Sequence, residues 1–468
     1  MFKQGQHIHL IGIGGSGMSG IAEVLLNLKC QVSGSDIHPG DTTKRLEMLG
    51  GKIYYGHNAN NIKDVDVVVY SSAVSEDNVE VAYAKSKRIP VIPRAEMLAE
   101  LMRLKYGIAI AGAHGKTTTT SMISLILTKA EFDPTVVVGG RFNDIGSNAR
   151  LGNSEYMVAE TDESDGSFLK LSPIISVVTN IDREHLDFYK NLDEIKLAFL
   201  TFMNKVPFYG RVIFCLDCPN LHDIMEKIER KWTSYGLSQE AQIKATEVVL
   251  NGSYSEYTLV INDKKLTKIR VNIPGVHYLS NSLAAVAVGL ELGIDLSVIK
   301  DALSSYGGVH RRLEIKGVVN GITIIDDYAH HPTEIKATLA TIKHKKPKRI
   351  IAVFQPHRYT RTKALAQEFG QAFNDASVVI VTPIYPAGEK PIPGVDSSLI
   401  VESLVKQDYP EVMFINSFPE VIEFLLDVAK PDDVVVTLGA GDVWKIGTEI
   451  IEIYRNSSVL AAHKGGEN

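Results

Sequence analysis

The sequence predicts an α/β protein of three successive domains, each built on a mainly parallel β-sheet. Its 468 residues exceed what one hydrophobic core usually supports, so about three domains are expected. Short runs rich in Val and Ile recur between segments of helical length, a pattern typical of parallel strands joined by crossover helices. Glycine-rich loops follow strands in the first two of these units. We place the three domains at residues 1–106, 107–310 and 311–468.

The first domain begins with a strand, "HIHLIGI", that leads into a G-x-G-x-x-G loop formed by Gly12, Gly14 and Gly17. A second apolar segment, "QVSGSD", ends at Asp36, about twenty residues further on, as in dinucleotide-binding folds. Such a loop presents backbone N–H groups at a helix N-terminus to a diphosphate. The domain is therefore predicted to be Rossmann-like, and a nicotinamide- or flavin-dependent oxidoreductase is one function that this loop alone supports.

The second domain is predicted to be a P-loop ATPase-like parallel sheet. "GAHGKTTTT" follows the strand "GIAIA", and it supplies a concave backbone, the cation of Lys116 and the hydroxyl of Thr117 at the start of a helix. The spacing is G-x-x-G-K-T, shorter than the common pattern, and Ile110 stands where its first glycine would be. We assign ATP binding to this loop: Gly112, Ala113, His114, Gly115, Lys116, Thr117 and Thr118.

Two later strand ends in the second domain carry candidate Mg2+ ligands. "YMVAETDESD" ends a strand at Glu160, and "SVVTNIDREH" ends the next one and presents His185. Because parallel strands bring their carboxyl ends to one edge of a sheet, these side chains are expected near the phosphate loop. Thr117, Glu160 and His185 are therefore the predicted metal ligands.

The remaining segments predict an antiparallel ribbon and a third α/β unit. Residues 242–274 alternate strands with the turns "NG" and "ND", which indicates a ribbon at the edge of the second sheet. From Arg311 onward, "GITIIDDYAHHP", "RIIAVFQP" and "DDVVVTLGAGD" give strands spaced by helices, a C-terminal Rossmann-like domain. The tail from Ser457 has little periodicity and is expected to be unstructured.

Composition excludes several classes of protein. The 49 basic and 55 acidic side chains give a net charge of −6, so no global field favours nucleic acid. Three cysteines are too few for a disulfide scaffold, and the C-x-x-C of Cys215 and Cys218 has no second pair that would indicate zinc. No apolar run is long enough to cross a membrane. We expect a soluble, cytoplasmic enzyme without membrane insertion.

Taken together, "G-x-x-G-K-T-T-T", "AETDESD", "TNID-x-x-H-x-D" and "GVHYLSNSLAA" resemble the Mur ligase family, the ATP-dependent amino-acid ligases of peptidoglycan precursor synthesis. The resemblance runs through all three domains. "DDYAHHPTEI" and "FQPHRYTR" are similar to the members of the family that add the first amino acid. A murein-peptide recycling ligase shares an "HHP" segment and is expected to differ at "PHRYTR".

The resemblance implies that ATP phosphorylates the lactyl carboxylate of UDP-N-acetylmuramate and that the amine of L-alanine then attacks the acyl phosphate. Such chemistry depends on positioning and on charge stabilisation, without a protein nucleophile. Closure of the third domain would complete the site and exclude water. The implied partners are UDP-N-acetylmuramate, L-alanine and ATP with Mg2+, and a monomer or weak homodimer is expected. The implied catalytic residues are Lys116, Glu160, His185, Arg312 and Asp327.

Further roles follow from the same resemblance. Asn281 matches the position that touches adenine, and Arg312 and Asp327 match positions near the nucleotide. Arg358 and Arg361 form a fork for the alanine carboxylate, while His330 contacts the amino acid or accepts a proton. The glycine loop then binds the UDP of the sugar nucleotide, because such a loop fits any diphosphate. The residues assigned to it are Gly12, Gly14, Gly15, Ser16, Gly17, Asp36 and Ser71.

Three alternatives stay open at this stage. The recycling ligase would use a tripeptide as acceptor, and an oxidoreductase would leave "GAHGKTTTT" without a role. A nucleotide-regulated binding protein without turnover is the third, although Lys116, Glu160 and His185 argue against it. Two segments also have a purely structural alternative to a binding role. Asn281 could cap a helix, and "HRYTR" could begin a surface helix with salt bridges. The general base for the amine is not indicated.

Overall fold

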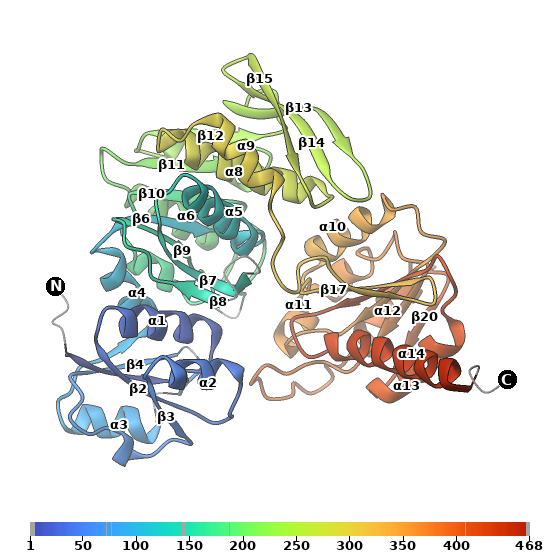
Figure 1. Cartoon of the computed structure of the whole chain (residues 1–468), viewed down its shortest axis with the longest axis horizontal. Coiled ribbons are helices and arrows are strands. Elements are labelled where there is room, and N and C mark those ends of the chain that lie inside the picture. Colours follow the sequence, from blue (N-terminus) through green and yellow to red (C-terminus); the bar gives the residue numbers. More distant parts are fainter. Residues whose placement is uncertain are drawn as a thin grey trace. The chain divides into compact units, whose positions relative to one another are not determined.

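The computed structural model describes residues 5–71, 73–75, 77–142, 147–186, 188–407 and 409–464 (Figure 1). The chain divides into two compact units. The first holds Met1–Val248, Glu256–Asn272 and Tyr278–Val309, and the second holds the rest of the chain, chiefly His310–Asn468. The chain forms three mainly parallel sheets, and helices alternate with their strands along the sequence. This arrangement confirms the predicted α/β class. The exact domain boundaries stay a prediction.

The N-terminal sheet has five parallel strands in the order β3-β2-β1-β4-β5. Figure 1 shows α1 on one face of this sheet and α3 on the other. The strand order reverses between β1 and β4, where the carboxyl ends of α/β sheets form ligand crevices. The strands are β1 (His7–Ile11), β2 (Gln31–Asp36), β3 (Lys52–Tyr55), β4 (Val67–Tyr70) and β5 (Val91–Pro93). The helices are α1 (Ser16–Asn27), α2 (Asp41–Met48), η1 (Ala59–Asn61), α3 (Val79–Ser86) and α4 (Arg94–Met102).

The middle sheet has ten strands in the order β15-β14-β13-β12-β11-β10-β6-β9-β7-β8, and β13 to β15 occupy the end where the ribbon was predicted. Helix α5 is buried without interruption from Thr117 to Leu127, so it gives the phosphate loop a rigid support. The strands are β6 (Tyr106–Ala111), β7 (Thr135–Phe142), β8 (Ser147–Arg150), β9 (Tyr156–Glu160), β10 (Ile175–Val178), β11 (Arg211–Cys215), β12 (Trp232–Gly236), β13 (Ile243–Leu250), β14 (Ser255–Ile261) and β15 (Lys264–Val271). The helices are α5 (Lys116–Lys129), η2 (Ser167–Lys170), α6 (Leu192–Asn204), α7 (Pro219–His222), η3 (Met225–Lys227), α8 (Val276–Glu291) and α9 (Leu296–Ser304).

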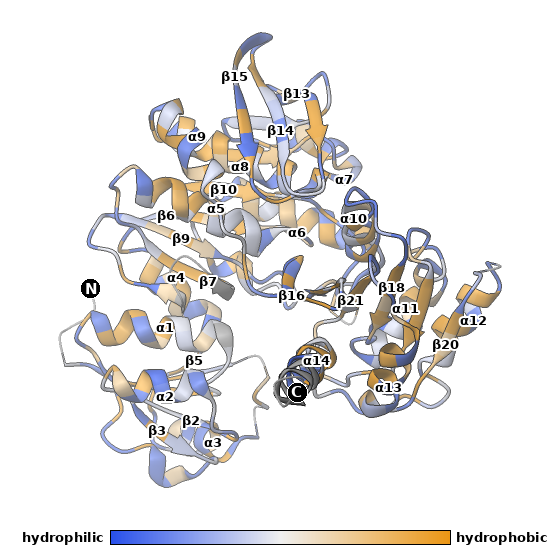
Figure 2. Ribbon diagram, turned by 45° about the vertical axis from the view of Figure 1, so that its right-hand side comes forward, coloured by the Kyte–Doolittle hydropathy of each residue, from blue (hydrophilic) through white to orange (hydrophobic). Residues whose placement is uncertain are grey.

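The C-terminal sheet has the order β16-β17-β21-β18-β19-β20, with β16 antiparallel and the other strands parallel. Figure 2 shows β18 in orange, in agreement with five buried apolar residues in "IIAVF". The strands are β16 (Glu314–Val319), β17 (Ile322–Asp327), β18 (Ile350–Phe354), β19 (Val378–Val381), β20 (Val412–Phe414) and β21 (Val434–Leu438). The helices are α10 (Pro332–Lys343), α11 (Tyr359–Phe369), α12 (Ser398–Val405), α13 (Phe418–Val428) and α14 (Trp444–Lys464).

Helix α14 corrects one expectation. It continues to Lys464, so the prediction of an unstructured tail from Ser457 is wrong up to that residue. The stretch "SSVLAAHK" contains neither Gly nor Pro, and Ala, Leu and Lys favour helix. Among the described residues, no helix combines the length and the apolar character that crossing a membrane would need.

A buried carboxylate in the N-terminal sheet gives a prediction for stability. The Glu80 side chain is inaccessible to solvent and accepts hydrogen bonds from Ser35 Oγ at 2.5 Å and Asn61 Nδ2 at 2.6 Å. Burial opposes the charge, but His9, Ser35 and Asn61 outweigh it and lower the pKa of Glu80 to about 2. A lowered folded-state pKa gives stability that is present above the unfolded value near 4.5 and lost as the pH falls toward 2.

We therefore expect Glu80→Gln to remove acid sensitivity worth about 3 kcal/mol, which is the size of this pKa shift in free energy. The measurement is the free energy of unfolding by denaturant between pH 6 and pH 3. Wild type should lose stability more steeply than the variant across this interval. Glu229→Gln, which changes an exposed carboxylate, is the control and should follow wild type. Parallel curves for wild type and Glu80→Gln would contradict the prediction.

Candidate active site

The glycine loop between β1 and α1 is held in place by β2. Gly12 has φ of 77°, a left-handed conformation that favours glycine. The N–H of Gly12 donates to the Ser35 carbonyl at 2.8 Å, and the N–H of Gly14 donates to Asp36 Oδ2 at 2.8 Å. Gly15 caps the N-terminus of α1. In this structure Asp36 holds the loop directly, and its expected place near the uridine end stays a prediction.

The loop lies in close contact with its neighbours. A Cβ on Gly14 would lie 2.8 Å from Asp36 Oδ2, and a Cβ on Gly17 would lie 2.7 Å from Arg94 Nη1. Ser71, at the end of β4, lies beside Gly12, whose added Cβ would be 3.2 Å from the Ser71 Cβ. The predicted glycines and Ser71 are thus brought together at one edge of the sheet. The backbone of Ser16 begins α1, but its side chain lies outside the described residues.

The phosphate loop is bound to the end of β10. The N–H of His114 donates to Asn180 Oδ1 at 2.8 Å, and Asn180 Nδ2 donates back to the His114 carbonyl at 3.0 Å. Gly112 and Gly115 have φ of 138° and 80°. A Cβ on Gly112 would lie 2.0 Å from Thr179 Oγ1, so this position has no room for a side chain. Contacts with Thr179 and Asn180 therefore fix the shape of the phosphate loop.

Lys116 lies at the centre of the site. Its Nζ donates to the Gly112 carbonyl at 2.5 Å and to Glu163 Oε1 at 2.6 Å. Burial disfavours the ammonium ion, but the carboxylates of Glu163 and Glu160 outweigh burial and raise the pKa of Lys116 above its ordinary value. Lys116 is therefore a cation throughout the physiological range, as a ligand of phosphate must be.

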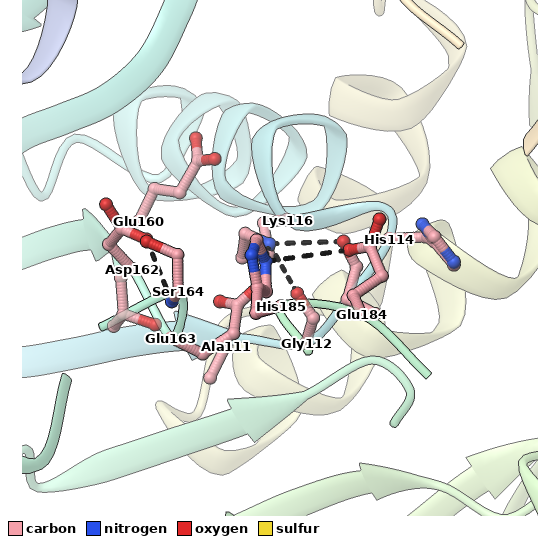
Figure 3. Close-up of polar contacts among 12 residues, drawn as sticks. Ala111, Gly112, His114, Lys116, Glu160, Asp162, Glu163, Ser164, Glu184 and His185 are labelled. Atoms are coloured by element: carbon pink, nitrogen blue, oxygen red, sulfur yellow. Dashed lines mark hydrogen bonds and ion pairs between the residues drawn. The ribbon is translucent and has the colours of Figure 1, made fainter. Parts of the chain in front are cut away.

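Acidic groups surround Lys116 in two sets. Thr117 Oγ1 lies 2.9 Å from both Oε1 and Oε2 of Glu160. Ligand atoms of Glu163, Glu184 and His185 all lie within 4.8 Å of one another. In the view of Figure 3, Lys116 and His185 lie between Glu160 and Asp162 on one side and Glu184 on the other. The structure thus gives His185 two acidic neighbours that were not predicted, Glu163 and Glu184, each 3.7 Å from its Nε2.

This second set fits a divalent cation. Glu163 is 3% exposed, and its Oε2 has no hydrogen-bond partner among the described residues. A buried carboxylate oxygen without a donor is costly unless a cation occupies its vicinity. Carboxylate oxygens are the ligands that Mg2+ prefers, and His185 adds one nitrogen.

One cavity joins the two glycine-rich loops. It encloses about 350 Å³ within the first unit. Gly15, Gly17 and Ser71 line it from the N-terminal sheet, and Lys116 and Glu160 line it from the middle sheet. A ligand held by the first loop can therefore extend to the lysine of the second.

Asn281 lies beside the phosphate loop. A Cβ on Gly115 would lie 2.6 Å from Asn281 Oδ1, and Asn281 is buried within α8. Its position inside the helix rules out the alternative of a helix cap. His114, also in the loop, has its Nε2 2.9 Å from Asp182 Oδ2.

In the second unit, Asp327 is the last residue of β17, and Arg312 lies just before β16. Asp327 accepts hydrogen bonds from the N–H groups of Leu313 at 2.7 Å and Ala329 at 2.8 Å. Burial raises the pKa of Asp327 to about 6, against the opposing effect of Arg312. The Arg312 guanidinium lies over the Tyr328 ring at 5.1 Å. Asp327 thus holds the backbone at Leu313, which follows Arg312, and at Ala329, which follows Tyr328.

Two of the predicted amino-acid residues, His330 and Arg361, lie beside an unpredicted histidine, His357. Its ring stacks on Tyr385 at 5.7 Å and meets the His330 ring edge-on at 5.6 Å. Arg361 Nη1 lies 3.1 Å from His357 Nδ1. Burial, followed by the charges of His330 and Arg361, lowers the pKa of His357 to about 2. Its neutral ring therefore accepts the hydrogen bond from Arg361.

Arg358 takes a separate position. It caps the N-terminus of α11 with φ of 72°, and its Nη1 lies 4.0 Å from Glu389 Oε1. The two predicted arginines thus have different neighbours in this structure. Both arginines belong to the segment that follows the carboxyl end of β18. Ligands of parallel sheets bind at that edge.

The chain matches three parts of one family: the Mur ligase family catalytic domain at residues 7–106, the Mur ligase middle domain at residues 110–289, and the Mur ligase, glutamate ligase domain at residues 311–441. Together the three matched segments cover most of the chain.

Individual proteins are similar over nearly the full length. The UDP-N-acetylmuramate–L-alanine ligase of Geotalea daltonii is 52% identical, and the match covers 98% of this chain and 100% of that protein. The enzyme of the same name from Geotalea uraniireducens is 53% identical, covering 97% and 99%. The crystal structure of UDP-N-acetylmuramate-alanine ligase MurC from Thermotoga maritima matches with TM-score 0.82, 30% identity and 96% and 99% coverage. A murein peptide ligase from Psychrobacter arcticus matches with TM-score 0.71, 25% identity and 96% and 98% coverage.

Proposed function

The chain belongs to the Mur ligase family, and from that premise we propose that it joins L-alanine to UDP-N-acetylmuramate with cleavage of ATP to ADP and phosphate. The observation that carries this proposal is the cavity lined by both Gly15 and Lys116, together with the high identity to ligases of that name. The cavity gives a sugar nucleotide and a triphosphate a shared space. An oxidoreductase would need no such second loop.

The first step transfers a phosphoryl group. A carboxylate oxygen of the sugar nucleotide attacks the γ-phosphorus of ATP, ADP leaves, and an acyl phosphate forms. Lys116 keeps its charge and lies at the end of the cavity, so it stabilises the charge on the transferring group. The glycine loop holds the diphosphate by backbone N–H groups at the N-terminus of α1, so the two reactants are positioned together.

Mg2+ would be held by the predicted ligands Thr117, Glu160 and His185, together with Glu163 and Glu184. When bound, the ion would supply positive charge that offsets the negative charge of the phosphate groups. Lys116 and the surrounding acids hold each other in position, because Lys116 Nζ lies 2.6 Å from Glu163 Oε1. The role of the protein at this point is to fix the charges before ATP arrives.

The second step forms the amide. The neutral amine of L-alanine attacks the acyl carbon and a tetrahedral intermediate forms; the intermediate then collapses to the amide as phosphate leaves with the proton that the nitrogen loses. We propose that Arg358 and Arg361 bind the alanine carboxylate and that His330 faces the amine. Asp327 acts by holding the backbone next to Arg312, since both of its carboxylate oxygens accept backbone N–H groups. Asn281 faces the adenine end of the phosphate loop.

Incubation of the full chain with UDP-N-acetylmuramate, ATP and Mg2+ tests the function. ADP release and the mass of the sugar-nucleotide product are measured with L-alanine, L-serine, glycine or the murein tripeptide as acceptor. L-alanine is expected to give the fastest turnover and a product heavier by one alanyl residue. Turnover with the tripeptide alone would instead indicate a recycling ligase, and absence of any acceptor-dependent ADP release would refute the proposal.

Replacement of Glu160 by glutamine is expected to raise the Mg2+ concentration for half-maximal activity by about tenfold or more, because a neutral amide is a weaker ligand than a carboxylate. Activity is measured as ADP release over a series of Mg2+ concentrations. Glu155→Gln changes an exposed carboxylate just before β9 and serves as the control. An unchanged Mg2+ dependence in Glu160→Gln would remove Glu160 from the metal site.

A further inference from the structure

The cavity contains an arginine that neither loop accounts for. We propose that Arg94 binds an acid group of the sugar nucleotide, either the diphosphate or the lactyl carboxylate, and that Asp162 is the positioning residue that orients its guanidinium. This inference rests on the proposed function. Arg94 and Asp162 both line the cavity, between the glycine loop and Lys116.

Arg94 approaches the expected diphosphate site from the side. It is the first residue of α4, immediately after β5, and its side chain is 18% exposed. Its Nη1 reaches the first turn of α1, where a Cβ on Gly17 would lie 2.7 Å away. The N-terminus of a helix and a guanidinium are both positive, so together they attract an anion, and Asp162 contacts the guanidinium only through Nη2. Any larger residue at position 17 would displace the arginine.

Asp162 fixes the other side of the guanidinium. Arg94 Nη2 donates to Asp162 Oδ2 at 2.7 Å, and Asp162 Oδ1 accepts from the N–H of Ser164 at 3.1 Å and from its Oγ at 2.6 Å. The carboxylate is therefore held by the backbone that follows β9. Among the described residues, Asp162 is the hydrogen-bond partner shown for Arg94, and a guanidinium has five N–H donors. Donors are left for a ligand in the cavity.

The location indicates what that ligand is. The sugar nucleotide must reach from Gly15 and Gly17 to Lys116, because its carboxylate has to meet the γ-phosphoryl group of ATP. Arg94 lies along this path, and the planar fork of arginine fits phosphate and carboxylate oxygens alike. An arginine that served only as an ion-pair partner would not need to line the cavity. The diphosphate and the carboxylate are the acid groups of the sugar nucleotide that this position fits.

The test measures binding by calorimetry with the full-length chain and its Arg94→Gln and Arg94→Lys variants. The ligands are ATP, UDP-N-acetylmuramate and UDP-N-acetylglucosamine, the last of which lacks the carboxylate. We expect Arg94→Gln to weaken UDP-N-acetylmuramate binding by about tenfold or more, as for loss of a hydrogen bond to a charged group, with a smaller loss for Arg94→Lys. Equal losses for both ligands identify the diphosphate, and a loss confined to UDP-N-acetylmuramate identifies the carboxylate.

Asp162→Asn tests the positioning role. It is expected to raise the KM for UDP-N-acetylmuramate with little change in the KM values for ATP and L-alanine. The double variant should bind no more weakly than Arg94→Gln alone, because Asp162 acts through Arg94. A purely structural ion pair would instead lower the melting temperature and change all three KM values together. Arg103→Gln, at the exposed end of the same helix, is the control.

The inference is overturned if both Arg94 variants bind UDP-N-acetylmuramate as wild type does, or if they lose ATP and sugar-nucleotide affinity equally. Wild-type turnover with L-alanine separates the two levels of the argument. If wild type shows no turnover, the proposed function fails. If wild type is active and the Arg94 variants bind normally, only this inference fails.

Discussion

Replacement of Lys116 by alanine is expected to lower kcat for ADP release by roughly a thousandfold, a loss typical of removing a group that stabilises charge in a transition state. The affinity for UDP-N-acetylmuramate should change little, because the proposed diphosphate site is the glycine loop at the N-terminus of α1 and not the phosphate loop. The two quantities are measured separately, kcat by ADP release and affinity by calorimetry. A large fall in kcat with unchanged affinity would assign Lys116 to phosphoryl transfer and not to assembly of the cavity.

Two variants make this result specific. Lys116→Arg keeps the charge but replaces a compact ammonium by a planar group, so it should recover only part of the activity. Lys129→Ala removes an exposed lysine at the other end of α5 and should behave as wild type. The melting temperature must also be compared, because loss of Lys116 leaves Glu163 buried without its cation. Near-normal kcat in a folded Lys116→Ala variant would contradict the proposed mechanism.

Residues close together in the sequence were the predictable part of the site. The phosphate loop needs glycine at Gly112 and Gly115, a lysine and a hydroxyl at the start of a helix, and all of these occur within a few residues. The glycine loop of the first domain is local in the same way. Strand ends were also predictable, since runs of β-branched residues mark buried parallel strands and their carboxyl ends gather at one edge. Glu160 and His185 came from this rule.

Residues that depend on the path of a loop could not be predicted. "ETDESD" offers four acids, and the strand end indicated Glu160, whereas the turn after β9 brings Glu163 to Lys116. The same turn brings Asp162 to Arg94, 68 residues away along the chain. No local pattern encodes a pair so far apart. Glu184 adjoins the predicted His185, whose backbone is left-handed with φ of 55°, a conformation that the sequence pattern did not indicate.

In the C-terminal domain, too, local sequence patterns predicted some of the site residues and tertiary contacts decided the others. "AHHP" and "HRYTR" indicated His330 and the two arginines through the family resemblance, and two arginines three residues apart after a strand end suit a small carboxylate. His357 belongs to the second of these segments, but its role depends on Tyr385, which comes from another strand end and stacks on its ring. A neutral, half-buried imidazole among arginines arises only from that packing. The sequence pattern locates the segments, and the tertiary contacts decide which of their side chains act together.

Replacement of Gly112 by alanine is expected to lower kcat/KM for ATP by about a hundredfold or more, since small displacements of positioning groups have effects of that size. The added Cβ would lie 2.0 Å from Thr179 Oγ1 and 3.1 Å from the backbone N of Asn180. The φ of 138° at this position is also unfavourable for alanine. The loop must therefore move away from β10, and the hydrogen bonds between Asn180 and the His114 backbone are lost. The measurement is ADP release over a series of ATP concentrations, with UDP-N-acetylmuramate affinity measured alongside.

Gly293→Ala separates steric conflict from backbone strain. Gly293 also has a positive φ, 71°, but no atom would lie within 4 Å of its added Cβ. This control should lose some stability and keep its kcat/KM for ATP, because it is strained without being crowded. If Gly112→Ala behaved in the same way, tight packing of the loop against β10 would not be what shapes the ATP site. A selective loss in Gly112→Ala, with UDP-N-acetylmuramate affinity retained, would mean that the contact with Thr179 sets the position of the phosphate loop.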